Sequence, residues 1–275
     1  MTTVTQAVEA LVRKTVDLSD ERMGTEWKWR DYDEEGLRFA LLMTHHELRD
    51  LAARLAAMRE QCTYAKAILA QYHQAYRDLT GVLAAVHDED LDRAPAPGEW
   101  PIREVGTHML GAEYGFLMMS RFGLERCRAG KADEPPEAEF DAFKVPYAAD
   151  RAKATAALST GTREQLRDAF AEVHIRILRE LGDIADPEID APAWFWDGPM
   201  PLRFRLHRFE EHLRQHTIQL DKTLVGIGRP PTEAHRLVRN IYNALADVES
   251  EPAPMPAARD EAARVIAERA AALPA

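Results

Sequence analysis

Cysteine is scarce in this sequence of 275 residues. Only Cys62 and Cys127 occur, far apart and outside any CxxC pattern. A disulfide framework or a zinc site built from thiolates requires more cysteines at characteristic spacings. We therefore expect neither feature, and we expect both thiols to be reduced.

Long hydrophobic runs and an excess of positive charge are missing as well. No stretch of about 18 apolar residues could span a membrane, and charged residues interrupt the first twenty positions, which excludes the apolar core of a signal peptide. The formal net charge is −11, which disfavours binding to nucleic acid or to anionic membrane surfaces. These absences predict a cytoplasmic protein with neither a nucleic-acid nor a membrane partner.

Period-two alternation is the third absence, so the sequence predicts an all-α protein. Helical periodicity covers residues 4–17, 35–58, 63–86, 101–127, 162–181, 202–225, 233–247 and 257–272. The proline-rich segments "KADEPPEAEFDAFKVPY" and "ADPEIDAPAWFWDGPMP" are interpreted as loops. We expect a four-helix core over residues 63–225, with helical extensions over 1–62 and 226–275.

The helix predicted over 202–225 carries two histidines on its apolar face. Its stripe of core positions, spaced three and four apart, comprises Leu202, Leu206, Phe209, Leu213, His216, Leu220 and Leu224. His216 thus stands where leucine would be expected. His212 lies one turn earlier, at the edge of the same face.

A third histidine lies near the apolar stripe of the helix predicted over 101–127. Val105, Met109 and Phe116 belong to this stripe, and His108 lies at its inward edge. Small residues follow on the same side of the helix, namely Gly111, Ala112 and Gly115. They either let a neighbouring helix approach closely or leave room beside the histidine.

His108, His212 and His216 together form a candidate metal site. Neutral imidazole binds zinc, nickel and similar ions, bundle cores house metals between facing helices, and three protein ligands leave coordination positions open. The alternative is that the His-x-x-x-His spacing is incidental and His108 is an ordinary packed histidine. The stretch "HLRQH" has no glutamate after its first histidine, so it differs from the zinc-protease motif HExxH.

Residues near these helices are candidates for a substrate pocket. Trp100, Trp194 and Trp196 lie on loops that adjoin the two helices, where they either wall a pocket or cap the end of the bundle. Gln219, one turn beyond His216, either supports that histidine or packs as an ordinary glutamine. Gly111 and Ala112 complete this candidate set.

Three arginines begin the helix predicted over 202–225. Arg203, Arg205 and Arg208 could bind a carboxylate or phosphate of a substrate. We interpret them instead as a solvated face, because isolated surface charges are common.

Two stretches resemble motifs of the DinB/YfiT-like superfamily. "APGEWPIREVGTHMLGAE" resembles that family's Pro-Gly-Glu-Trp turn followed by a helix with an inward histidine, and "HRFEEHLRQHTIQL" resembles its closing pair of histidines. The resemblance covers residues 63–225 and implies a four-helix bundle whose helices are not packed in sequential order. It also implies a divalent metal on His108, His212 and His216.

Members of this family with known activity are mostly transferases or isomerases that use a low-molecular-weight thiol such as mycothiol or bacillithiol. The resemblance therefore implies a metal-dependent thiol transferase or isomerase with a small molecule as substrate. Zinc or nickel is the expected ion, because imidazole binds both. The alternatives are a hydrolase in which the metal activates water, a non-catalytic or stress-related metal-binding bundle, and a plain helical scaffold with packed histidines. The additional helices make a homodimer a further hypothesis.

Overall fold

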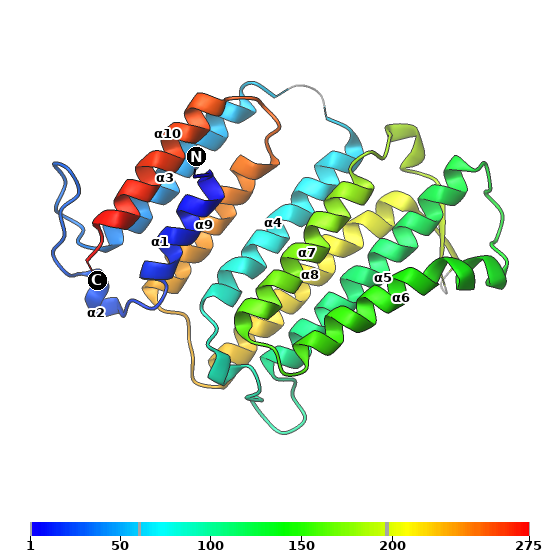
Figure 1. Ribbon diagram of the computed structural model, residues 1–275, viewed down its shortest axis with the longest axis horizontal. Coiled ribbons are helices and arrows are strands. Elements are labelled where there is room, and N and C mark those ends of the chain that lie inside the picture. Colours follow the sequence, from blue (N-terminus) through cyan, green and yellow to red (C-terminus); the bar gives the residue numbers. More distant parts are fainter. Residues whose placement is uncertain (1, 60–61, 196–197, 275) are drawn as a thin grey trace. The chain divides into compact units, whose positions relative to one another are not determined.

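The computed structural model describes residues 2–59, 62–195 and 198–274, and this part of the chain is predominantly helical (Figure 1). The all-α prediction is confirmed. The helices are α1 (Val4–Thr15), α2 (Asp20–Met23), α3 (Arg38–Ala56), α4 (Tyr64–Ala84), α5 (Ile102–Arg128), α6 (Glu137–Leu158), α7 (Arg163–Leu181), α8 (Leu202–Gly226), α9 (Glu233–Ser250) and α10 (Pro256–Ala272). Short 3₁₀ turns, Asp88–Asp90 and Asp186–Glu188, lie in the connections.

Threonine side chains start three of these helices. Thr3, Thr162 and Thr232 each accept a hydrogen bond from the backbone three residues later, and the side chain at that later position bonds back to the cap. Such capping boxes satisfy backbone donors that a helix start leaves without partners. They explain why α1, α7 and α9 begin where they do.

The chain divides into two compact units. One comprises residues 1–61, 77–85 and 229–275, so that segments from both ends of the sequence belong to it. In this unit α1 packs against α10, and α3 packs against α9 and α10 (Figure 1). Leucine, valine and alanine side chains from these helices form its buried core. The division of the sequence at residues 62 and 225 stays a prediction.

The other unit comprises residues 62–76 and 86–228. Helix α5 is its central element, because α6, α7 and α8 all pack against it (Figure 1). Leu110, Leu117, Phe209 and Leu213 are among its fully or almost fully buried side chains. The paired faces of α5 and α8 provide the framework for the candidate site.

Helix α6 corrects the interpretation of residues 131–147 as a loop. The helix runs from Glu137 to Leu158 and contains Pro146 in its interior. Only Tyr147 and Leu158 are buried in it, so it lacks the regular apolar stripe that marks the other helices. Its aromatic residues nevertheless pack on α5, with the ring of Phe143 5.1 Å from that of Phe122.

The second expected loop contains a short hairpin. Strand β1 (Pro192–Phe195) pairs antiparallel with β2 (Gly198–Pro201), and Ala193 stands opposite Met200. The hairpin packs on α5 at Gly123, where a Cβ atom would lie 2.7 Å from Cβ of Ala193. Period-two alternation could not reveal strands of four residues rich in proline.

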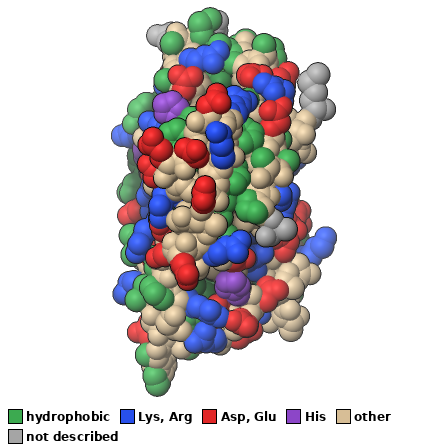
Figure 2. Space-filling view, turned by 90° about the vertical axis from the view of Figure 1, so that its left-hand side faces the viewer, with side chains coloured by type: hydrophobic (Ala, Val, Ile, Leu, Met, Phe, Trp, Pro, Cys, Tyr) green, Lys and Arg blue, Asp and Glu red, His purple; other side chains and the backbone are tan. Residues whose placement is uncertain are grey.

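The described helices include none that is both long and apolar enough to cross a lipid bilayer. On the face shown in Figure 2, acidic and basic side chains are interspersed among apolar ones. The described side chains on this face therefore form no extended surface of a single charge.

Candidate metal centre

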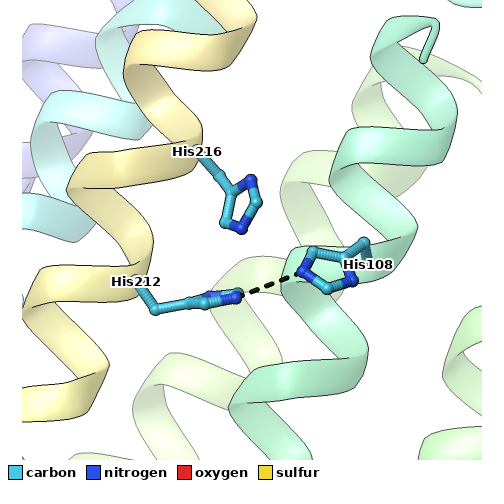
Figure 3. Close-up of side chains that lie close together, drawn as sticks. All are labelled: His108, His212 and His216. Atoms are coloured by element: carbon cyan, nitrogen blue, oxygen red, sulfur yellow. Dashed lines mark hydrogen bonds between the residues drawn. The ribbon is translucent and has the colours of Figure 1, made fainter. Parts of the chain in front are cut away.

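Helices α5 and α8 bring three histidines together. His108 comes from α5, and His212 and His216 come from successive turns of α8 (Figure 3). The Nε2 atoms of His108 and His212 are 3.3 Å apart. One ligand atom from each of the three residues lies within 4.8 Å of the other two, so all three fall within about 2.8 Å of a common point (4.8 Å divided by √3).

The burial of the three rings differs between the two helices. The side chains of His212 and His216 are buried, with 6% and 8% of their residue surfaces exposed. His108 is exposed, although the sequence pattern placed it at an inward edge. Its ring contacts those of His212 and His216 on α8 and also borders an open cavity. The cluster is therefore held by the protein on the α8 side and reachable from solvent on the α5 side.

Burial, followed by nearby side chains, lowers the pKa of two of these imidazoles, His108 and His212. Burial, followed by the proximity of His216, His108 and Arg208, lowers the pKa of His212 to about 3. Burial, followed by His216 and Arg151, also lowers the pKa of His108. Neutral imidazole has a lone pair available for a metal ion, whereas imidazolium has none.

Gln219 fixes the orientation of His216. The Nδ1 atom of His216 lies 2.7 Å from Oε1 of Gln219. An amide oxygen only accepts hydrogen bonds, so Nδ1 carries the proton and Nε2 keeps its lone pair. This arrangement selects the tautomer whose Nε2 is free to act as a ligand.

The donor set fits a divalent ion of the zinc or nickel type. It consists of three imidazole nitrogen donors from two helices, close enough to share one ion. Three protein ligands leave coordination positions for other molecules. The geometry of the cluster is thus compatible with metal binding.

A cavity of about 550 Å³ opens beside the cluster. His108 and His212 form part of its wall, as do Gly111 and Ala112 from the sequence-based candidate set. The small residues of α5 thus border open space beside the histidine, one of the two roles considered for them. The volume lies in the range of small-molecule sites.

The tryptophans expected near the site differ in position. The ring centroid of Trp100 lies 5.2 Å from that of His108, so this residue adjoins the cluster. Trp194 lies on β1 and is not among the residues that line the cavity. Trp196 lies outside the described residues.

Several residues of the cavity wall were not among the pocket candidates chosen from the sequence. Phe116, Met118 and Phe204 supply apolar surface, and Arg151 reaches the cavity from α6. The prediction of a loop over residues 131–147, with no helix before residue 162, gave no reason to place Arg151 opposite α5. A prediction of a helix over residues 137–158 would have put Arg151 one turn after Tyr147, on the side that faces α5.

The three arginines at the start of α8 have separate roles. Arg205 is buried and donates to the carbonyl oxygens of Ala193 and Gly198 in the hairpin, so it does not belong to a solvated face. Arg208 pairs with Glu211 at 2.6 Å and also borders the cavity. Arg203, at the surface, forms an ion pair with Asp190.

Comparison with models of protein families identifies the family to which this chain belongs. The model of the DinB superfamily matches residues 71–220, more than half of the chain and the whole of the segment that carries the three histidines. The chain belongs to the DinB superfamily. Comparisons with curated proteins and with solved structures gave no significant match.

Proposed function

We propose that the protein binds one divalent metal ion, zinc or nickel, through His108, His212 and His216, and that it is a thiol-dependent transferase or isomerase. The observation that carries the proposal is the convergence of three ligand atoms within 4.8 Å of one another, beside a cavity of small-molecule size. Membership of the DinB superfamily supports it.

A bound ion with open positions lowers the pKa of a thiol or water that reaches it, which favours the nucleophilic form at neutral pH. The protein's own residues provide the setting. Gln219 orients His216, and the buried surroundings of His212 keep its imidazole neutral. The exposed edge at His108 gives a thiol and a second substrate access from the cavity.

The test is turnover by the metal-loaded protein. Zinc- and nickel-loaded samples would be incubated with mycothiol, bacillithiol or glutathione and a panel of electrophiles, and consumption of the thiol would be followed. We expect turnover with at least one pair and its loss in His216→Ala. His207→Ala is the matched control, because His207 lies on the same helix but outside the cluster.

The alternative is a metal-binding protein without catalytic activity. It predicts that the wild type holds metal yet consumes none of the thiols beyond the rate of His216→Ala. That result would contradict the catalytic part of the proposal but not the proposed metal site.

A further inference from the structure

The cavity beside the histidine cluster is rich in positive charge. Arg151, Arg205 and Arg208 line it, and neither aspartate nor glutamate is among those lining residues that the structure describes. The chain as a whole has a formal net charge of −11. A positively charged cavity in a protein of negative net charge concentrates small anions and repels cations.

The three arginines are not equally available to a ligand. Arg205 is buried and bonded to the carbonyl oxygens of the hairpin. Arg208 is neutralised in part by Glu211. Arg151 is exposed, and no ion pair joins its guanidinium to an acidic side chain in the described ranges of the chain. Its charge is the one that a ligand can compensate.

Gly111 makes room for this guanidinium on α5. A Cβ atom at position 111 would lie 3.1 Å from Nε and 3.2 Å from Nη2 of Arg151. The glycine is three residues after His108, so it lies on nearly the same side of the helix. The guanidinium of this exposed arginine therefore lies against α5, close to the turn that carries His108.

Apolar side chains form the remaining wall. Phe116, Met118, Met119 and Phe204 line the same cavity as Arg151. Together they can cover a hydrocarbon or aromatic body several carbon atoms long. The planar guanidinium of Arg151 suits a carboxylate, which it can bind through two parallel hydrogen bonds.

We propose that this cavity binds an organic carboxylate with an apolar body, that Arg151 holds the carboxylate, and that the rest of the molecule lies along Phe116 and Met118 toward His108. This inference deepens the proposed function, because it assigns a chemical class to the second substrate of the same site. A single guanidinium that forms no ion pair with an acidic side chain of the described residues matches the single charge of a carboxylate.

The experiment compares two probes of nearly equal shape, phenylbutyrate and phenylbutyramide, by titration calorimetry on the full-length zinc-loaded protein. We expect the carboxylate to bind at least about tenfold more tightly than the amide, because one charge-assisted hydrogen bond contributes about that much affinity. Arg151→Gln removes this preference. Lys153→Gln, an exposed position on the same helix outside this cavity, retains it.

Metal content, measured by mass spectrometry in each variant, separates this inference from the proposed function. Arg151→Gln should hold as much zinc as the wild type, so its loss of preference cannot come from loss of the ion. A carboxylate that bound only to the ion would bind equally well to Arg151→Gln, and this would overturn the inference. Equal binding of the two probes by the wild type would overturn it too.

A protein without metal would refute the proposed function but not the role of Arg151. In that case the carboxylate should still bind more tightly than the amide, and the preference should still disappear in Arg151→Gln. The two proposals therefore fail separately.

Discussion

The Nδ1 atom of His216 donates a hydrogen bond to Oε1 of Gln219 over 2.7 Å. The two residues are three positions apart on α8, so the helix itself brings them together. This bond determines which nitrogen of His216 is free to bind a metal ion, because the proton stays on Nδ1.

Gln219→Ala should therefore weaken metal binding without abolishing it. Partners that orient a metal-binding histidine typically contribute about 10- to 100-fold in affinity. Zinc affinity, measured by competition with a chromophoric chelator, should fall by that factor. Gln215→Ala is the control, because Gln215 is exposed on the same helix and should leave the affinity unchanged. Equal effects of the two substitutions would contradict a specific role for Gln219.

A buried carboxyl group makes stability depend on pH. Glu113 is buried in the core around α5, where it accepts a hydrogen bond from the hydroxyl of Tyr72. Burial raises the pKa of Glu113 to about 8 from its ordinary value of 4.5, and the bond from Tyr72 opposes this increase. Between these two values the folded protein retains a proton that the unfolded chain has released.

The free energy of unfolding should accordingly decrease as pH rises from 5 to 8, by about 1.4 kcal/mol per pH unit from this group. Glu113→Gln keeps an oxygen for Tyr72 and cannot ionise, so it should remove this slope and be more stable than the wild type at pH 8. Urea unfolding at several pH values measures both effects. The exposed Glu104, changed to Gln, should leave the slope intact. A Glu113→Gln variant with the wild-type slope would show that another group is responsible.

A buried arginine stabilises the unit formed by the two ends of the chain. Arg269 is 1% exposed and donates two hydrogen bonds to the carboxylate of Glu47 and one to Thr44. Arg269→Ala would leave a partly buried carboxylate without its partner, at a cost of about 3 kcal/mol in the free energy of unfolding.

The control for Arg269 lies on the same helix. Arg264 is exposed and pairs with Glu261 and Glu268 at the surface. Exposed pairs of this kind contribute less than about 1 kcal/mol, so Arg264→Ala should change thermal stability little. If Arg264→Ala lost as much stability as Arg269→Ala, burial would not explain the cost of removing Arg269.

The helices that carry the site could be predicted from sequence because local signals agree there. Apolar residues at spacings of three and four define the buried faces of α5 and α8. The position of His216 within that stripe was enough to predict an inward imidazole, and the structure buries it.

Helix α6 could not be predicted in the same way. Pro146 in its interior is a strong helix breaker by local rules, and few of its residues are buried. Its packing on Phe122 of α5 through Phe140 and Phe143 stabilises it despite those signals. Because Arg151 depends on this helix, the basic side of the cavity depends on tertiary contacts that local sequence does not encode.

The metal content of the purified, tag-free protein is the most direct test of the account. Mass spectrometry would compare the wild type with a variant in which His108, His212 and His216 are all alanine, and with His207→Ala as control. The account predicts near-stoichiometric zinc or nickel in the wild type and in His207→Ala, and none in the triple variant. Absence of metal from the wild type, even after incubation with both ions, would contradict it and leave the three histidines as packing residues.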